Sequence, residues 1–182
     1  ETVVEVVAER APGRFGIDPI RDVQVLAPMY RGAVGIDALN ERLRDRLNPG
    51  GRRALGDRFR IGDRLIQTRN SHELGLMNGS IVFLRADSPD DEEIVVETDE
   101  GGTLTIPYGE TANLRLAYAI SVHKAQGCEV PVVVGVCHRS HARMLSRPLL
   151  YTAITRARTS CVLVGDSAAL HAALRRDDAG DR

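Results

Sequence analysis

The fold is decided by the stretch Ser121-Val122-His123-Lys124-Ala125-Gln126-Gly127-Cys128-Glu129, which leads into the apolar run Val132-Val133-Val134-Gly135-Val136. The pattern is repeated where Tyr151-Thr152-Ala153-Ile154-Thr155-Arg156-Ala157-Arg158 precedes Cys161-Val162-Leu163-Val164. Apolar, β-branched runs of this kind are typical of central strands in a parallel sheet covered on both faces. Polar residues at the edges of such strands are where α/β proteins build ligand sites. The two polar blocks therefore predict an α/β domain and mark its candidate site.

Further elements of this domain lie toward both ends of the chain. Residues 23–27 form a short apolar run, which predicts a buried strand. Residues 36–47 carry isoleucine and leucine at spacings of three and four, which predicts a helix with one apolar face. Residues 149–158 predict a helix between the two later strands, and residues 167–176 predict a closing helix. Strand and helix alternate, as in α/β folds.

The middle of the chain has a different pattern, with short apolar runs separated by turn residues. The expected strands are residues 64–68, 80–84, 93–97 and 103–106, with turns at Asn78-Gly79 and Glu100-Gly101-Gly102. This spacing predicts a small antiparallel sheet or barrel. We therefore divide the chain into residues 1–56, the first part of the α/β domain, residues 57–110, a β insert, and residues 111–182, the remainder of the α/β domain.

Composition excludes several classes of protein. The net charge is −1, so no global charge attracts nucleic acid or membrane, and a nucleic-acid site must come from local clusters such as the nine Arg against three Asp in residues 42–69. No apolar stretch reaches the roughly 20 residues needed to span a bilayer. The three cysteines lack metal-ligand spacing and indicate free thiols. We expect a cytoplasmic protein with no metal site and no membrane partner.

The sequence contains no GxxxxGK[ST] phosphate-binding loop. A nucleotide site built from the two polar blocks would therefore be only half a site. The chain also begins at Glu1, without an initiator methionine. We expect it to be an excised part of a longer protein.

Three blocks, in order, resemble the motifs of superfamily 1 helicases. Ala27-Pro28-Met29-Tyr30-Arg31-Gly32 resembles motif IV, and the blocks at 121–129 and 151–158 resemble motifs V and VI. A narrower resemblance to the RecD-like DNA helicases is carried by Leu39-Asn40, Asn48-Pro49, residues 62–70, Asn78-Gly79 and residues 117–124. The similarity spans about residues 23–166. It implies a RecA-like second motor domain of the P-loop NTPase type, interrupted by a small SH3-like β-barrel insert.

The resemblance implies a nucleotide site shared with another domain. Arg156 would be the arginine finger that reaches the γ-phosphoryl group, where positive charge stabilises the transition state. Arg31 would be a second phosphate-facing arginine, although a loop arginine beside Gly32 could equally be solvated. Gly127 and Glu129 would approach the nucleotide, with the carboxylate accepting hydrogen bonds from ribose hydroxyls. Tyr151 is not assigned to the ligand, because local packing or hydrogen bonding is the simpler role.

The resemblance also implies contact with single-stranded DNA. Ser121, His123 and Lys124 would donate to phosphate oxygens, which positions the strand without reading its sequence. In the insert, Arg64, Arg69 and Asn70 offer a basic edge that could follow the strand. Base stacking by the insert has little support, since only 4% of residues are aromatic.

The expected function is the C-terminal part of an ATP-dependent DNA helicase of the RecD-like type, inactive alone. ATP and Mg²⁺ would be held in the full-length parent by the N-terminal RecA-like domain of the same chain, and recombination or repair proteins are possible partners. Two alternatives stay open: the helicase portion of a conjugative relaxase, and a non-enzymatic nucleic-acid-binding module. An upstream phosphate-binding loop would separate the motor from the binding module, and an upstream nickase domain would indicate a relaxase.

Overall fold

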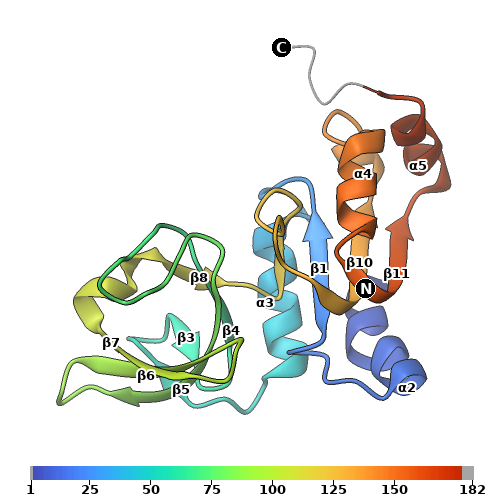
Figure 1. Cartoon of the computed structure of the whole chain (residues 1–182). Helices are drawn as coiled ribbons and strands as arrows, with labels where there is room; N and C mark the ends of the chain where they lie inside the picture. Colours follow the sequence, from blue (N-terminus) through green and yellow to red (C-terminus); the bar gives the residue numbers. More distant parts are fainter. Residues whose placement is uncertain (1, 178–182) are drawn as a thin grey trace. The chain divides into compact units, whose positions relative to one another are not determined.

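The structure is a computed structural model that describes residues 2–177 and divides into two compact units. The first unit combines the two ends of the chain, up to Leu47 and from Tyr118 onward, and the second is Asn48–Ala117 (Figure 1). The predicted α/β class with a β insert is confirmed. The insert begins earlier and ends later than the expected 57–110. The strands at its two ends are only two or three residues long and leave no periodic pattern in the sequence.

The first unit is built on a four-stranded parallel sheet. Its strands are β1 (Val23–Ala27), β9 (Ala119–Ser121), β10 (Val130–Cys137) and β11 (Ala157–Gly165), in the spatial order β11-β10-β1-β9. The chain leaves β1 through α3 (Ile36–Leu47) toward β9, and leaves β10 through α4 (Arg147–Ile154) toward β11. These two connections run in opposite directions, so the topological switch point lies between β1 and β10.

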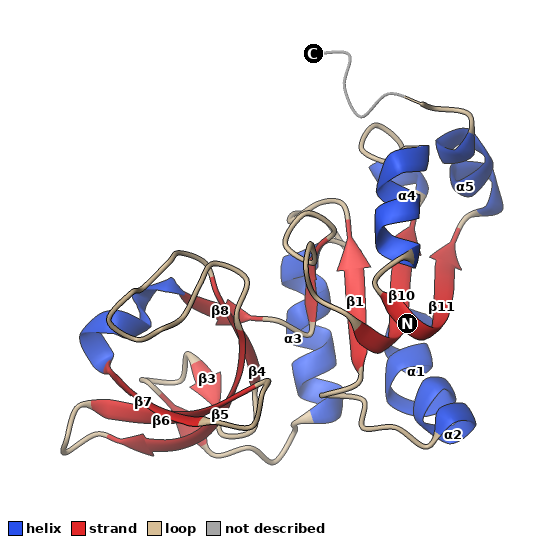
Figure 2. Ribbon diagram, viewed as in Figure 1, coloured by secondary structure: helices blue, strands red, loops and turns tan. Residues whose placement is uncertain are grey.

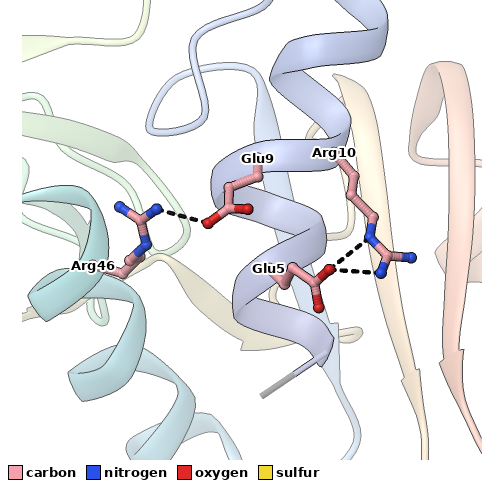
Figure 3. A network of polar contacts seen from close by, with 4 residues as sticks. All are labelled: Glu5, Glu9, Arg10 and Arg46. Carbon is pink, nitrogen blue, oxygen red and sulfur yellow. Dashed lines mark hydrogen bonds and ion pairs between the residues drawn. The ribbon is translucent and has the colours of Figure 1, made fainter.

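Helices complete the first unit (Figure 2). The chain starts with α1 (Thr2–Glu5), the π-helical turn η1 (Val6–Arg10) and α2 (Ala11–Phe15), and α5 (Ser167–Leu174) ends the unit. The N-terminal helical segment was not predicted, because its buried valines are typical of strands. Exposed ion pairs join Glu9 to Arg46 of α3 at 2.7 Å and Glu5 to Arg10 at 2.6 Å (Figure 3).

One predicted helix is shorter than expected. The sequence predicts a helix over residues 149–158, but α4 ends at Ile154 and Ala157 already pairs with Val130 in the sheet. Residues 158–160 of β11 are polar, which conceals their strand character in the sequence. Arg158 is therefore a strand residue.

The second unit is an antiparallel β structure that curls around one core (Figure 2). Its sheet has the order β7-β6-β5-β4-β8, beside the hairpin β2-β3. The bounds are β2 Arg53–Ala54, β3 Phe59–Arg60, β4 Arg64–Gln67, β5 Ile81–Ser88, β6 Glu93–Thr98, β7 Thr103–Pro107 and β8 Leu114–Leu116. A 3₁₀ segment, η2 (Tyr108–Asn113), links β7 to β8, and η3 (Arg139–His141) lies after β10 in the first unit. All four expected strands are present.

A buried amide fixes the edge strand β9 to α3. The Asn40 side chain is 6% exposed; its Nδ2 donates to the Ala119 carbonyl, and its Oδ1 accepts from the Ala119 N–H, both at 2.9 Å. Residues 40 and 119 flank the whole insert, so this pair fixes where the chain re-enters the sheet. Gln24 adds a hydrogen bond from its Nε2 to the Tyr118 carbonyl at 3.2 Å.

Asn40→Ala should therefore destabilise the chain by about 2–5 kcal/mol, because a buried N–H and a buried carbonyl each lose their partner. Urea unfolding followed by circular dichroism measures this change. Arg46→Ala, which removes an exposed ion pair on the same helix, is the matched control and should cost less than about 1 kcal/mol. Equal effects of the two substitutions would contradict a structural role for Asn40.

Candidate functional site

Charged side chains gather at the edge where β10 and β11 begin, here called the amino edge. The Val130 N–H donates to the Arg156 carbonyl at 3.0 Å, which places residue 129 beside residue 156. Arg158 donates from Nε to Glu129 Oε2 at 3.4 Å, and both side chains are more than half exposed. Arg156, Arg158 and Glu129 thus form a charged cluster at the amino ends of two neighbouring strands.

Arg156 has no carboxylate partner in the described part of the chain. Its Nη2 donates to Thr155 Oγ1 at 3.3 Å, and its shielded Nε has no partner. Among residues 2–177, no carboxylate pairs with it. A guanidinium presented in this way can accept an anionic ligand without first breaking an ion pair.

Gly127 and Glu129 differ in how ready they are for a ligand. Gly127 has φ +85°, and a Cβ at this position would meet no atom within 4 Å. Its left-handed conformation favours glycine, and its backbone is open to a ligand. The Glu129 carboxylate is already held by Arg158, a partner that the sequence analysis did not identify, so a ribose would have to share it.

A second cluster lies at the opposite edge, where β1 and β9 end, here called the carboxyl edge. Ala27 is level with Ser121 in the parallel pair, so the segments that follow them are neighbours. Lys124 Nζ lies 5.9 Å from the centroid of the Tyr30 ring. His123 and Arg31 are exposed, whereas Ser121 is only 9% exposed and its Oγ accepts from the Lys124 N–H at 3.3 Å. Ser121 therefore shapes the turn that presents Lys124.

The structure separates Arg31 from Arg156. Leu26, near the end of β1, is level with Gly135 of β10 and with Leu163 of β11. Leu163 lies six residues beyond Ala157, the residue at which β11 begins. Six strand residues span roughly 20 Å, and Arg31 lies beyond the end of β1. This placement does not agree with the expectation that both arginines face one phosphoryl group. The separation agrees with the order of the elements in the sequence, because the motif IV block follows its strand and the motif VI block precedes its own, and these strand ends lie at opposite edges of a parallel sheet. The expectation of a shared phosphoryl group came from the family resemblance alone.

The basic edge expected in the insert is reduced by burial. Arg64 is 2% exposed, with its Cζ 6.0 Å from the centroid of the Phe83 ring, because all four residues of β4 are buried. It does not fit the role of an exposed DNA contact. Arg69 and Asn70 are exposed, and Asn70 Oδ1 accepts from the Asn78 N–H at 2.8 Å. Asn70 thus holds its own loop, which leaves Arg69 as the exposed cation of the three.

Tyr151 is more exposed than the sequence suggested. It was expected to pack or to hydrogen-bond locally, but it is 70% exposed on α4.

Among the described residues, no group of three or more His, Cys, Asp and Glu side chains could hold a metal ion. No helix within residues 2–177 has the length and apolar character to cross a bilayer.

Two family models match the chain: one lies almost wholly in the first unit, and the other runs from α3 through most of the insert. Residues 116–164 match the UvrD-like helicase C-terminal domain, and residues 39–97 match the ATP-dependent RecD-like DNA helicase SH3 domain. These matches cover the segment after the insert and most of the insert itself. They agree with the two folds described above.

Curated relatives extend the same similarity. The ATP-dependent RecD2 DNA helicase of Deinococcus radiodurans is 40% identical over 157 residues, which are 85% of this chain and 21% of that protein. The RecBCD enzyme subunit RecD of Mycolicibacterium smegmatis is 29% identical over 163 residues, 90% of this chain and 28% of that protein. The chain thus spans about a fifth to a quarter of the length of the curated relatives it matches.

Solved structures share the fold. Pif1 helicase from Bacteroides, in complex with ADP-AlF3 and single-stranded DNA, aligns with a TM-score of 0.55 and 19% identity over 91% of this chain and 44% of that one. Pif1 helicase from Candida albicans aligns with a TM-score of 0.56 and 15% identity over 88% of this chain and 48% of that one. At these identities the likeness concerns the fold alone.

Arg156→Ala should leave the stability of the chain within about 0.5 kcal/mol of wild type, because within residues 2–177 the side chain has no ion pair to lose. Arg58→Ala is the contrasting variant. Arg58 Nη2 donates to the Leu114 carbonyl at 2.6 Å, and burial, together with nearby Arg115, lowers the pKa of its guanidinium. Its removal should cost about 1–3 kcal/mol. Thermal unfolding measures both, and a clearly destabilised Arg156 variant would assign that arginine a structural role.

Proposed function

Since the chain belongs to the RecD-like superfamily 1 DNA helicases, we propose that it supplies half of an ATP-hydrolysing site and part of a single-stranded DNA track to its parent protein. The parent would be an ATP-dependent DNA helicase of the cytoplasm. The partner half of the ATP site would be the upstream RecA-like domain of the same protein. Recombination or repair proteins would be further partners.

One observation carries the nucleotide half of this proposal: Arg156 stands at the amino edge without a carboxylate partner among residues 2–177. A γ-phosphoryl group held by a facing domain would find there a guanidinium with free donors. Positive charge at this point stabilises the charge that develops during phosphoryl transfer. Gly127, two residues before Glu129, offers open backbone, and Glu129 offers carboxylate oxygens for ribose hydroxyls.

This chain holds neither the triphosphate nor Mg²⁺ by itself. Its sequence has no phosphate-binding loop, and its described residues include no cluster of metal-binding side chains. In the parent, Mg²⁺ neutralises charge on the phosphate oxygens. This chain supplies to the nucleotide site only Arg156 and the segment that carries Gly127 and Glu129. We therefore propose that the isolated chain does not hydrolyse ATP.

The carboxyl edge is the proposed DNA-facing side. His123 and Lys124 can donate to phosphate oxygens, and such contacts position a strand irrespective of its sequence. Arg31 lies in the neighbouring loop, so we reassign it from the nucleotide to this cluster. Arg69 of the insert is a further exposed cation of the DNA track, whereas Ser121 and Asn70 shape loops.

In the full-length parent, Arg156→Ala should lower ATP turnover by roughly 10³-fold or more while nucleotide binding is largely kept, as for other arginine fingers. Steady-state hydrolysis and a fluorescent-nucleotide titration measure the two effects. Arg46→Ala is the control and should match wild type.

The same assay tests the reassignment of Arg31. Arg31→Ala should leave turnover in the absence of DNA within about threefold of wild type, because single surface contacts away from the reacting atoms contribute little. If both arginine variants lost DNA-independent turnover equally, Arg31 would belong to the nucleotide site. If neither lost it, the arginine-finger assignment would fail.

Lys124→Ala should weaken binding of this chain to a labelled single-stranded oligonucleotide and flatten its salt dependence. Removal of one protein–phosphate interaction along a single strand reduces the slope of log K against log salt by about 0.7. Fluorescence anisotropy at several salt concentrations gives the slope, with Arg46→Ala as the charge-matched control. An unaltered slope for the Lys124 variant would remove this residue from the DNA track.

A further inference from the structure

An exposed aromatic ring stands at the carboxyl edge, next to the cations assigned to DNA. Tyr30 is 45% exposed in the loop after β1. The chain has four tyrosines, of which Tyr118 is buried and Tyr108 donates from its hydroxyl to Asp87 Oδ1. Tyr151 is the other exposed tyrosine, on α4. Tyr30 alone of the four thus combines an open ring with neighbouring cations at this edge.

The contact between Tyr30 and Lys124 joins two segments that are far apart in the sequence. Lys124 Nζ lies 5.9 Å from the Tyr30 ring centroid, and the Lys124 turn is closed by Ser121 Oγ. Arg31, the next residue in the chain, is also exposed. The Lys124 ammonium lies over the ring, and the ring is still 45% exposed. An exposed aromatic ring together with cations offers both components that bind a single strand, since bases stack on the ring and phosphates meet the cations.

The loop that carries Tyr30 is held in place by its own backbone. The Asp37 N–H donates to the Tyr30 carbonyl at 3.1 Å, and the Ile36 N–H donates to the Met29 carbonyl at 2.9 Å. Gly35 allows this closure, because a Cβ there would lie 2.5 Å from the carbonyl oxygens of Tyr30 and Arg31. A ring on a fixed loop loses little conformational freedom on binding, which favours stacking.

The position of the ring within the fold also indicates a ligand. Tyr30 follows the carboxyl end of β1, at the switch point between β1 and β10, where open parallel sheets bind ligands. Figure 2 shows β1 beside β10. We infer that Tyr30 is a base-stacking platform for single-stranded DNA, with Lys124 and Arg31 receiving the adjacent phosphates. This inference rests on the proposed DNA-facing role of the carboxyl edge. It assigns contact with the bases to Tyr30, which is not one of the residues proposed to contact phosphates.

The inference is tested by comparing two oligonucleotides of equal length, one of thymidines and one of abasic sites. Tyr30→Ala should weaken binding of the thymidine strand by on the order of 5- to 100-fold, the range for the loss of one base–aromatic stack. It should leave binding of the abasic strand unchanged, because the phosphates are the same. Tyr30→Phe keeps the ring and should bind both strands as wild type does, and Tyr151→Ala is the exposed-tyrosine control.

A second measurement detects stacking directly. The chain has no tryptophan, so Tyr30→Trp introduces a single indole whose emission can be excited selectively. Thymidine strands should quench this emission on binding, and abasic strands should not. Tyr151→Trp provides the matched control and should show no quenching with either strand.

The outcomes separate this inference from the function on which it rests. If Lys124→Ala flattens the salt dependence of DNA binding but Tyr30→Ala binds as wild type does, the stacking inference fails and the proposed DNA track stands. An equal loss for thymidine and abasic strands would overturn stacking in favour of a role in positioning Lys124. If wild type binds neither strand, the proposed DNA-facing edge itself is wrong.

Discussion

The two hydrogen bonds between Asn40 and Ala119 are the constraint on which the arrangement of the first unit depends. The chain leaves this unit after α3, builds the whole insert, and returns as the three-residue strand β9. A strand this short has few ladder bonds, and it lies at the edge of the sheet. The Asn40 amide satisfies both the N–H and the carbonyl of Ala119, which β1 alone does not do. Ser121 and Lys124 come shortly after Ala119 in the sequence. The Asn40 amide therefore also fixes the start of the segment that carries Lys124 to the carboxyl edge.

The segment from Ser121 to Val130 links the two candidate sites covalently. It starts at the carboxyl end of β9 and finishes at the amino end of β10, so its nine residue steps cover the height of the sheet, roughly 20 Å. The first part turns back on itself, with the Ala125 N–H donating to the Ser121 carbonyl at 3.2 Å. The second part passes through Gly127 to reach Glu129. A single connection without a helix therefore presents Lys124 at one edge and Glu129 at the other.

The elements that were predicted correctly from the sequence are those whose apolar pattern agrees with their burial in the structure. The valine-rich run of β10 and the one-sided helix α3 are both confirmed. Several residues that carry the family resemblance proved structural, since Asn48 Nδ2 donates to Asp63 Oδ1 at 2.8 Å and to the Ile61 carbonyl at 3.0 Å. The separation of Arg31 and Arg156 was missed because their roles were taken from the family resemblance, although one block follows its strand and the other precedes its own in a parallel sheet. The burial of Arg64 depends on packing around β4, which alternation along one strand does not report.

The identity of the single lysine follows from the same geometry. The chain has 24 basic residues, and 23 of them are arginine. A guanidinium is planar and stacks on aromatic faces, so an arginine at position 124 would compete with a base for the ring of Tyr30. An ammonium is a compact point charge with three donors, so the Lys124 Nζ over the ring covers less of it than a planar guanidinium would and can still donate to a phosphate. With Tyr30 as the stacking platform, lysine is the cation that can donate to the phosphate while covering the smaller part of the ring.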